Sequence, residues 1–306
     1  MTKEKQLIVI AGPTAVGKTS MAIDLACQFS TEIISADSRQ FFQEMSIGTA
    51  KPTEHELSLA VHHFVNNLSI EENYDAGKFA EEAELLLVQL FKKHDKVILV
   101  GGSGMYIKAL CDGFDEMPDV PQELRNELSE IWANGNQEIL LKELEQKDPE
   151  FYAFVDHRNK QRVTRALEVI RATGKTYSSF RKGQKKVQKA YSIVKIGLER
   201  ERSELYQLIN LRMDAMIDQG LFEEVENLYP YKELNALQTV GYREVFDYLD
   251  RKYDKEEAIR LLKRNSRRYA KRQMTWFKKD EEFNWFSPED KELIIEYIER
   301  LSKETE

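Results

Sequence analysis

The chain has 306 residues, of which 42% are hydrophobic and 32% charged, and its formal net charge at pH 7 is −8. This length allows one large domain or two smaller ones, and the composition is that of an ordinary globular protein. The longest apolar runs are strand-length, far below the ~20 residues of a membrane span, and no signal-peptide pattern is present. The two cysteines form no CxxC motif, so we expect a reducing, cytoplasmic setting without a membrane partner.

Hydrophobic periodicity in the first third of the chain predicts alternating strands and helices. The apolar run 7–11 predicts a buried strand, and residues 18–29 have the spacing of an amphipathic helix. Residues 33–36 predict the next strand, 78–93 a helix and 96–100 another buried strand. Such alternation is typical of a parallel sheet covered by helices, with ligands at the carboxyl ends of its strands.

The next part of the chain predicts helices only, at 121–132, 136–146 and 160–173. The third has Asn159 at its N-cap position and Gly174 at its C-terminal cap position. A strand returns at 192–198 and helices follow. We therefore predict a P-loop-type α/β core at 1–115 and 191–306, flanked by helices, with an inserted all-helical domain at 116–190.

A phosphate-binding loop lies between the first predicted strand and helix, where the sequence matches G-x-x-x-x-G-K-[ST]. Its backbone N–H groups and the helix N-terminus are suited to phosphate oxygens, while Lys18 adds a charge and Thr19 a hydroxyl for Mg²⁺. No acid ends the 96–100 strand as a Walker-B metal site requires, which favours a diphosphate leaving group. The predicted diphosphate-binding residues are Gly12, Pro13, Thr14, Ala15, Val16, Gly17, Lys18 and Thr19.

Residues 37–40 follow the second predicted strand, at the edge of the sheet that faces the phosphate loop. Asp37 in this place is suited to a general base or to supporting a metal, and Gln40 to hydrogen-bonding a base edge. Asp and Ser are also common turn formers, so from these residues alone a turn and a catalytic site are equally good interpretations.

Seven segments together resemble one known family, the bacterial tRNA dimethylallyltransferases, also called tRNA isopentenyltransferases. The resemblance runs nearly end to end and in the family's order. The segments are GPTAVGKT at 12–19, DSRQ at 37–40, IGTAKPT at 47–53, GGSGMY at 101–106, NKQRVTRALEV at 159–169, VGYRE at 240–244 and YAKRQMTWF at 269–277.

The resemblance implies transfer of a dimethylallyl group from dimethylallyl diphosphate to N6 of the adenosine immediately 3′ of the anticodon, with Mg²⁺ as cofactor. It implies catalytic roles for Lys18, Asp37 as general base and Ser103 near the reaction centre, with Thr19 helping to bind the metal. The residues implied to contact tRNA are Asp37, Ser38, Arg39, Gln40, Ser103, Arg125, Gln161, Arg162, Val163, Thr164, Arg165, Arg212, Arg268, Lys271 and Arg272. Phe42 and Leu208 depart from the Tyr and Arg that are usual in the family.

Charge is unevenly distributed, which favours a polyanionic partner despite the acidic average. Residues 156–189 hold eleven basic and two acidic residues, and residues 260–279 hold nine basic residues and no acid. A solvated face is the alternative interpretation of both segments. We interpret Trp276 and Phe277 as core residues rather than platforms for bases.

Two other functions remain open at this point. A P-loop small-molecule or nucleoside kinase binding ATP explains the loop but not the basic helices. A non-catalytic RNA-binding protein explains the helices but leaves Asp37 without a role. We expect a monomer, His62 and His63 in packing or a turn rather than a metal site, and Cys27 in the core.

Overall fold

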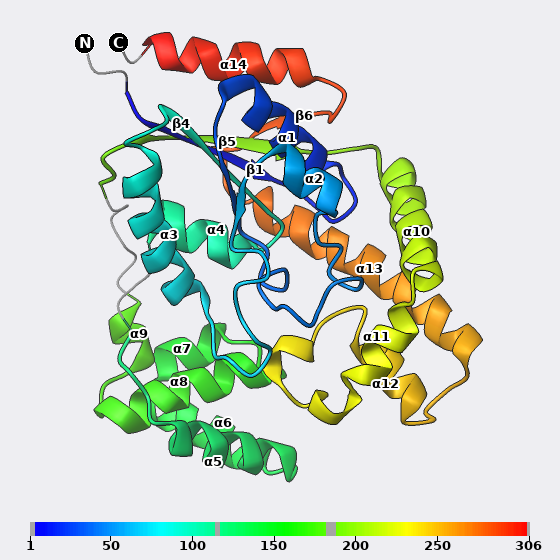
Figure 1. The fold of residues 1–306 in the computed structure, drawn as a ribbon. Helices are drawn as coiled ribbons and strands as arrows, with labels where there is room; N and C mark the ends of the chain where they lie inside the picture. The colour runs from blue at the N-terminus through cyan, green and yellow to red at the C-terminus, as the bar shows by residue number, and fades with distance from the viewer. Residues whose placement is uncertain (1–3, 114–116, 182–187, 305–306) are drawn as a thin grey trace. The chain divides into compact units, whose positions relative to one another are not determined.

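The computed structural model describes residues 4–113, 117–181 and 188–304. The chain divides into two compact units, one made of Met1–Cys111 with Gln188–Glu306 and the other of Asp112–Val187. The predicted boundary between residues 115 and 116 lies outside the described residues, as do Lys182, Lys185 and Lys186 of the basic segment. Figure 1 shows the two units as ribbons, and each is described by itself below.

In the described part of the first unit, six strands form one parallel sheet in the order β3-β2-β4-β1-β5-β6, which confirms the predicted parallel-sheet core. The four central strands match their predicted ranges to within one residue. The two edge strands are two and three residues long, too short to give a sequence pattern. The bounds are β1 Gln6–Ala11, β2 Ile33–Ser35, β3 His62–His63, β4 Lys96–Gly101, β5 Ser192–Leu198 and β6 Asn284–Phe286.

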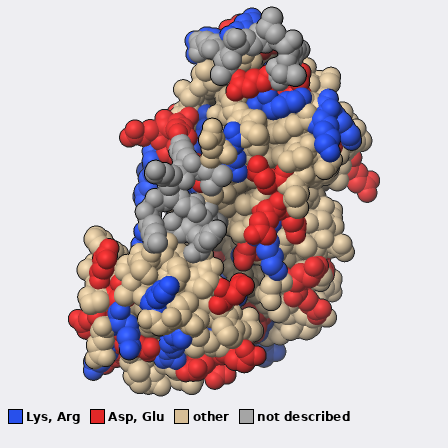
Figure 2. Space-filling view, turned by 90° about the vertical axis from the view of Figure 1, so that its left-hand side faces the viewer, with Lys and Arg blue, Asp and Glu red and all other residues tan. Residues whose placement is uncertain are grey.

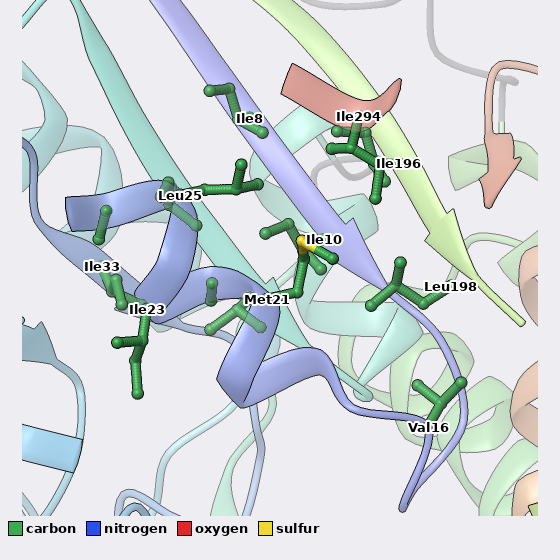
Figure 3. Packing of buried hydrophobic residues seen from close by; sticks show 14 of the residues in the cluster. Ile8, Ile10, Val16, Met21, Ile23, Leu25, Ile33, Ile196, Leu198 and Ile294 are labelled. Carbon is green, nitrogen blue, oxygen red and sulfur yellow. The ribbon is translucent and has the colours of Figure 1, made fainter. Parts of the chain in front are cut away.

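Successive side chains of each strand point to opposite faces of the sheet. Both faces are buried, because a hydrophobic cluster covers each of them. In the parallel register Ile8 lies beside Ile98 and Val194, and all three belong to one core cluster. The neighbouring residues Leu7 and Val97 belong to the cluster on the other face. Figure 3 shows the first cluster, in which strand residues meet side chains of the first and last helices. Continuous apolar strands are therefore required here.

Helices cover both faces of the sheet (Figure 1). α1, α10 and α14 contribute to the first cluster, and α3 and α4 to the second. A third cluster joins α10 to α13 around Tyr242 and Leu262. The bounds are α1 Lys18–Phe29, α2 Glu54–Leu59, α3 Ala76–Leu90, α4 Gly104–Asp112, α10 Arg202–Asp218, α11 Leu221–Asn227, α12 Arg243–Leu249, α13 Lys255–Phe277 and α14 Lys291–Glu304, with short 3-10 turns η1 Tyr229–Tyr231 and η2 Asn235–Leu237.

The predicted burial of Cys27 is wrong, because this thiol is exposed on α1 while the adjacent Ala26 packs in the core. Both cysteines are free thiols, which agrees with the absence of a CxxC motif. Among the described residues, no helix is both long enough and apolar enough to span a membrane.

The described part of the second unit is helical, as predicted. Asn159 caps α8 by accepting a hydrogen bond from the N–H of Arg162 at 3.2 Å, and Gly174 ends it in the left-handed region at φ 71°. Leu128, Leu140 and Leu167 form part of its core. The helix bounds are α5 Gln122–Ala133, α6 Gln137–Lys147, α7 Pro149–Phe154, α8 Lys160–Thr173 and α9 Tyr177–Phe180.

Candidate active site

A cavity of about 140 Å³ lies within the first unit, at the carboxyl ends of β1, β2 and β4. Its walls come from the phosphate loop, the turn after β2, residues 48–52, helices α10 and α13, and residues 239–241. Ligand binding at the carboxyl ends of strands is the position expected for an open parallel sheet.

The phosphate loop joins β1 to α1 and leaves the helix N-terminus facing the cavity. Gly12 and Gly17 have φ values of 155° and 110°, which favour glycine, and Ala15 is also left-handed at 64°. A Cβ atom on Gly12 would lie 2.6 Å from the carbonyl oxygen of Leu198, so a side chain is excluded there. Val16 is fully buried in the core, so only its backbone is available to a ligand. Thr14, Ala15, Lys18 and Thr19 line the cavity.

Lys18 has an unusually acidic ammonium group for a lysine. Burial, helped by the nearby positive charge of Arg212, lowers the pKa of Lys18 to about 7, although the charge of Asp37 opposes this. Its Nζ donates a hydrogen bond to the Pro13 carbonyl at 2.7 Å. A bound anion restores the positive charge, because it offsets the desolvation that disfavours that charge.

Three side chains distant in sequence hold the phosphate loop, and only one of them was predicted as a site residue. Gln273 accepts a hydrogen bond from the N–H of Thr14 at 2.9 Å. Arg212 donates to the Thr14 hydroxyl at 3.4 Å, and Arg200 donates to the Val16 carbonyl at 3.2 Å. Gln273 lies in the 269–277 motif, which was the available sequence signal. Arg200 had none.

Asp37 lines the same cavity and also forms a turn. Its Oδ1 accepts a hydrogen bond from the N–H of Arg39 at 3.0 Å. The turn and site interpretations are therefore compatible, since the carboxylate still borders the cavity together with Arg39 and Gln40. Its role as a base stays a prediction.

Ser103 supports the turn from the end of β4. Its hydroxyl accepts from the N–H of Ser38 at 2.9 Å and donates to the Ser38 hydroxyl at 3.1 Å, but Ser103 does not line the cavity. The Gln40 amide donates to the carbonyls of Thr49 and Ala50 at 3.3 and 3.1 Å. In this structure Gln40 thus binds the chain's own backbone rather than a base edge.

His62, which was expected only to pack or turn, lies on edge strand β3 and lines the cavity. Its Nδ1 is 2.8 Å from the Ala60 carbonyl, so Nδ1 carries the proton and Nε2 is an acceptor. Nε2 is buried without a hydrogen-bond partner among the residues described, and burial lowers the pKa of the ring. His63 instead pairs with Glu32 at 2.7 Å.

The donors present fit Mg²⁺ of the kind that binds together with a substrate. In the described ranges no three His, Cys, Asp or Glu side chains form a metal site by themselves. A hydroxyl at Thr19 and a carboxylate at Asp37 border the cavity. Mg²⁺ commonly takes one or two protein oxygens and completes its shell with phosphates and water.

Only part of the basic face of α13 is free of ion pairs with acidic residues. Lys263 pairs with Asp214 at 2.5 Å and Arg260 with Glu257 at 2.6 Å, so acids outside 260–279 balance part of the charge. Phe277 is 2% exposed, which confirms a core position, whereas Trp276 is 38% exposed and is not fully in the core as expected. Within residues 260–277, the exposed basic residues that make no ion pair with any residue whose placement is described are Arg268, Lys271 and Arg272.

In the second unit, the expected tRNA contacts separate into exposed and buried residues. Val163 is fully buried in the core of that unit, so its side chain offers no surface to RNA, and contact of this residue with tRNA stays a prediction. Thr164 is 6% exposed and donates to the Lys160 carbonyl at 2.9 Å, which leaves its side chain little surface for RNA. Gln161 and Arg162 are exposed.

Acids accompany the remaining basic residues of the second unit. Arg125 and Arg165 share Glu168, at 3.9 and 3.1 Å. In Figure 2, Lys and Arg side chains are intermixed with Asp and Glu on the face drawn, so that face is not uniformly basic. The charge imbalance of the sequence therefore overstates the free positive charge.

The model of the family described as IPP transferase matches residues 40–280. The chain belongs to the IPP transferase family. It is 49% identical to the tRNA dimethylallyltransferase of Cytophaga hutchinsonii over 98% of both chains. Among solved structures, the tRNA isopentenylpyrophosphate transferase of Bacillus halodurans is 36% identical, with a TM-score of 0.73 over 99% of this chain and 98% of the other.

A eukaryotic dimethylallyltransferase described as acting on tRNA is 28% identical, with a TM-score of 0.75 over 89% of this chain and 69% of that one. Membership of the IPP transferase family confirms the resemblance inferred from the motifs. The family model begins at Gln40 and includes α10 and α13, while the phosphate loop falls within the regions shared with the near full-length relatives.

Proposed function

We propose that this IPP transferase family member transfers a dimethylallyl group from dimethylallyl diphosphate to N6 of the adenosine immediately 3′ of the anticodon in tRNA. The products are N6-isopentenyladenosine and diphosphate. The observation that carries the proposal is one cavity bordered by both Lys18 of the phosphate loop and the Asp37 carboxylate. The names of the relatives support the choice of donor and acceptor.

The phosphate loop holds the leaving diphosphate. The N–H groups at the start of α1 and the ammonium of Lys18 neutralise charge that accumulates as the C–O bond breaks. Thr19, with the diphosphate oxygens, would hold Mg²⁺, which supplies further charge neutralisation. The apolar lining from Ile209, Met213 and Met216 suits the five-carbon group.

Asp37 accepts the proton that the adenine amino group loses. The N6 lone pair forms the new bond to the allylic carbon, the bond from that carbon to the diphosphate oxygen breaks, and the N6 proton moves to the carboxylate. The base must leave the RNA stack to reach the cavity, as enzymes acting on a base require. Ser103 and Ser38 hold the turn that presents Asp37.

The exposed basic residues of α13, together with Arg162 in the second unit, supply contacts to the anticodon stem-loop. We place the enzyme in the cytoplasm, which contains its tRNA substrate and keeps free thiols reduced. We also propose that the enzyme acts as a monomer.

The proposal is tested by the nature of the phosphate product. The protein is incubated with Mg²⁺ and unmodified tRNA, and with either dimethylallyl diphosphate or ATP. Diphosphate release that requires both tRNA and the allylic donor supports the proposal. ADP formation with ATP, and no release from the allylic donor, supports the kinase interpretation instead.

A further inference from the structure

The Glu224 carboxylate on α11 accepts four hydrogen bonds. Its Oε2 accepts from the N–H groups of Ser46 at 2.9 Å and Ile47 at 2.7 Å. Its Oε1 accepts from the N–H of Gly48 at 3.0 Å and from the hydroxyl of Tyr242 at 2.6 Å. Three successive backbone amides thus converge on one negative charge, and charge-assisted hydrogen bonds are the stronger kind.

Tyr242 packs against the same segment. Its ring is fully buried, and a Cβ atom on Gly48 would lie 2.6 Å from it. Burial and the neighbouring charge of Glu224 raise the pKa of the Tyr242 hydroxyl, so it stays a donor to the carboxylate. Residues 46–48 are thus held by a carboxylate, and Gly48 also packs against an aromatic ring.

This segment leads directly into the cavity. Gly48 and Thr49 line it. The carbonyls of Thr49 and Ala50 accept both hydrogen bonds from the Gln40 amide, and Gln40 follows Asp37 by three residues. The position of the proposed base is therefore linked through Gln40 and residues 46–50 to Glu224.

The phosphate loop is held by other groups. Its supports are the side chains of Gln273, Arg200 and Arg212. In the parts of the chain that the structure describes, none of these three hydrogen bonds involves residues 46–50 or Glu224. The two walls of the cavity, one beside the diphosphate and one beside the acceptor base, are thus held by different hydrogen bonds, although Arg212 also lines a second pocket together with Ser46 and Ile47.

We infer that Glu224 is a positioning residue for the acceptor nucleotide, acting through residues 46–50 and Gln40, with no part in diphosphate binding. This inference rests on the proposed transfer to RNA. It predicts that loss of the carboxylate separates two quantities that a general loss of structure lowers together, namely tRNA turnover and diphosphate affinity.

The test is Glu224→Gln, with Glu223→Gln as the matched control on the same helix, where the side chain is exposed. The amide keeps the shape of the Glu224 side chain but removes its charge. Its NH₂ group then faces a backbone N–H or the Tyr242 hydroxyl, which are donors as well. We expect kcat/KM for tRNA to fall about tenfold or more. We expect the Kd of inorganic diphosphate, measured by calorimetry, to stay within about twofold of wild type, and Glu223→Gln to leave both quantities unchanged.

Hydrogen exchange of the peptide covering residues 46–50 is measured on the same proteins. It is expected to be faster in Glu224→Gln than in the control, with a smaller change in Tyr242→Phe, which removes one of the four donors. Equal losses of tRNA turnover and diphosphate affinity, or unchanged exchange at 46–50, overturn the inference. Absence of product with the wild-type chain overturns the proposed function instead. The hydrogen-exchange and diphosphate measurements need no turnover, so they still test whether Glu224 holds residues 46–50 without affecting diphosphate binding.

Discussion

Gln273 and Thr14 are 259 residues apart in sequence, yet the Thr14 N–H donates a hydrogen bond to Gln273 Oε1 at 2.9 Å. The other half of the amide donates to the Gly102 carbonyl at 3.0 Å. Gln273 is 7% exposed and comes from α13. One buried amide therefore joins the phosphate loop, the residue that follows β4 and the helix that bears the exposed basic residues. The shape of the loop depends on the packing of α13.

Replacing Gln273 with Leu is expected to lower the free energy of unfolding by about 1–3 kcal/mol, because the N–H of Thr14 and the carbonyl of Gly102 lose their partners. Urea denaturation measures this change. Lys271→Leu, two residues earlier and exposed, is the control, with an expected change of about 0.5 kcal/mol or less. Equal stability of the two variants contradicts the structural role assigned to Gln273.

Diphosphate binding is expected to weaken as pH rises above about 7. Lys18, with a pKa of about 7 in the free protein, is charged below that pH and loses its proton above it. A bound anion raises this pKa, so binding above pH 7 takes up a proton and becomes less favourable, whereas below pH 7 no uptake by Lys18 is needed.

Calorimetry with inorganic diphosphate, in buffers of different ionisation enthalpy, measures this proton uptake. Because diphosphate itself titrates, Lys18→Met provides the baseline, and its affinity is expected to be lower and its pH dependence shallower. The same pH dependence in both proteins would show that Lys18 does not titrate in this range.

Asp37→Asn is expected to lower single-turnover product formation by about 10²–10⁴-fold, the usual contribution of a general base. The asparagine side-chain oxygen still accepts from the N–H of Arg39, so the turn is preserved. Affinity for the anticodon stem-loop should therefore stay within about threefold of wild type. A variant that binds RNA poorly but turns over normally once saturated contradicts the assignment of Asp37 as the base.

The parts of the fold that the sequence predicted are those with local signals. The 12–19 motif and the apolar run before it locate β1 and the start of α1. Asn159 and Gly174 give the bounds of α8 because capping depends on adjacent residues. The fold class follows from the alternation of such elements.

The missed parts depend on contacts between distant segments. Helix α4 was not predicted, and Gly104 at its start lies against the ring of Trp276, where a Cβ atom would be 2.2 Å from it. Val163 was assigned both to an apolar stripe and to tRNA; packing confirms the first, and the buried side chain offers no surface for the second, which stays a prediction. Nothing near His62 in sequence indicates that its ring borders the cavity.

The exposed residues Arg268, Lys271 and Arg272 are expected to contribute electrostatically to RNA binding. Replacing each with Gln should weaken the affinity for the anticodon stem-loop and lower the slope of log K against log salt by ~0.7–0.9 for each phosphate that the variant no longer neutralises. Arg260→Gln is the control, because this guanidinium is already paired with Glu257. Equal slopes in all four variants would show that α13 does not bind the RNA backbone.

Mass spectrometry of nucleosides shows whether the protein transfers the dimethylallyl group to tRNA with Asp37 as the base. Wild-type protein and Asp37→Asn are each incubated with Mg²⁺, dimethylallyl diphosphate and unmodified tRNA that has adenosine immediately 3′ of the anticodon, and the RNA is then digested. We predict adenosine carrying one added five-carbon unit at that position with the wild-type protein, and almost none with the variant. Unmodified adenosine after incubation with wild-type protein that is shown to bind the tRNA would contradict this prediction.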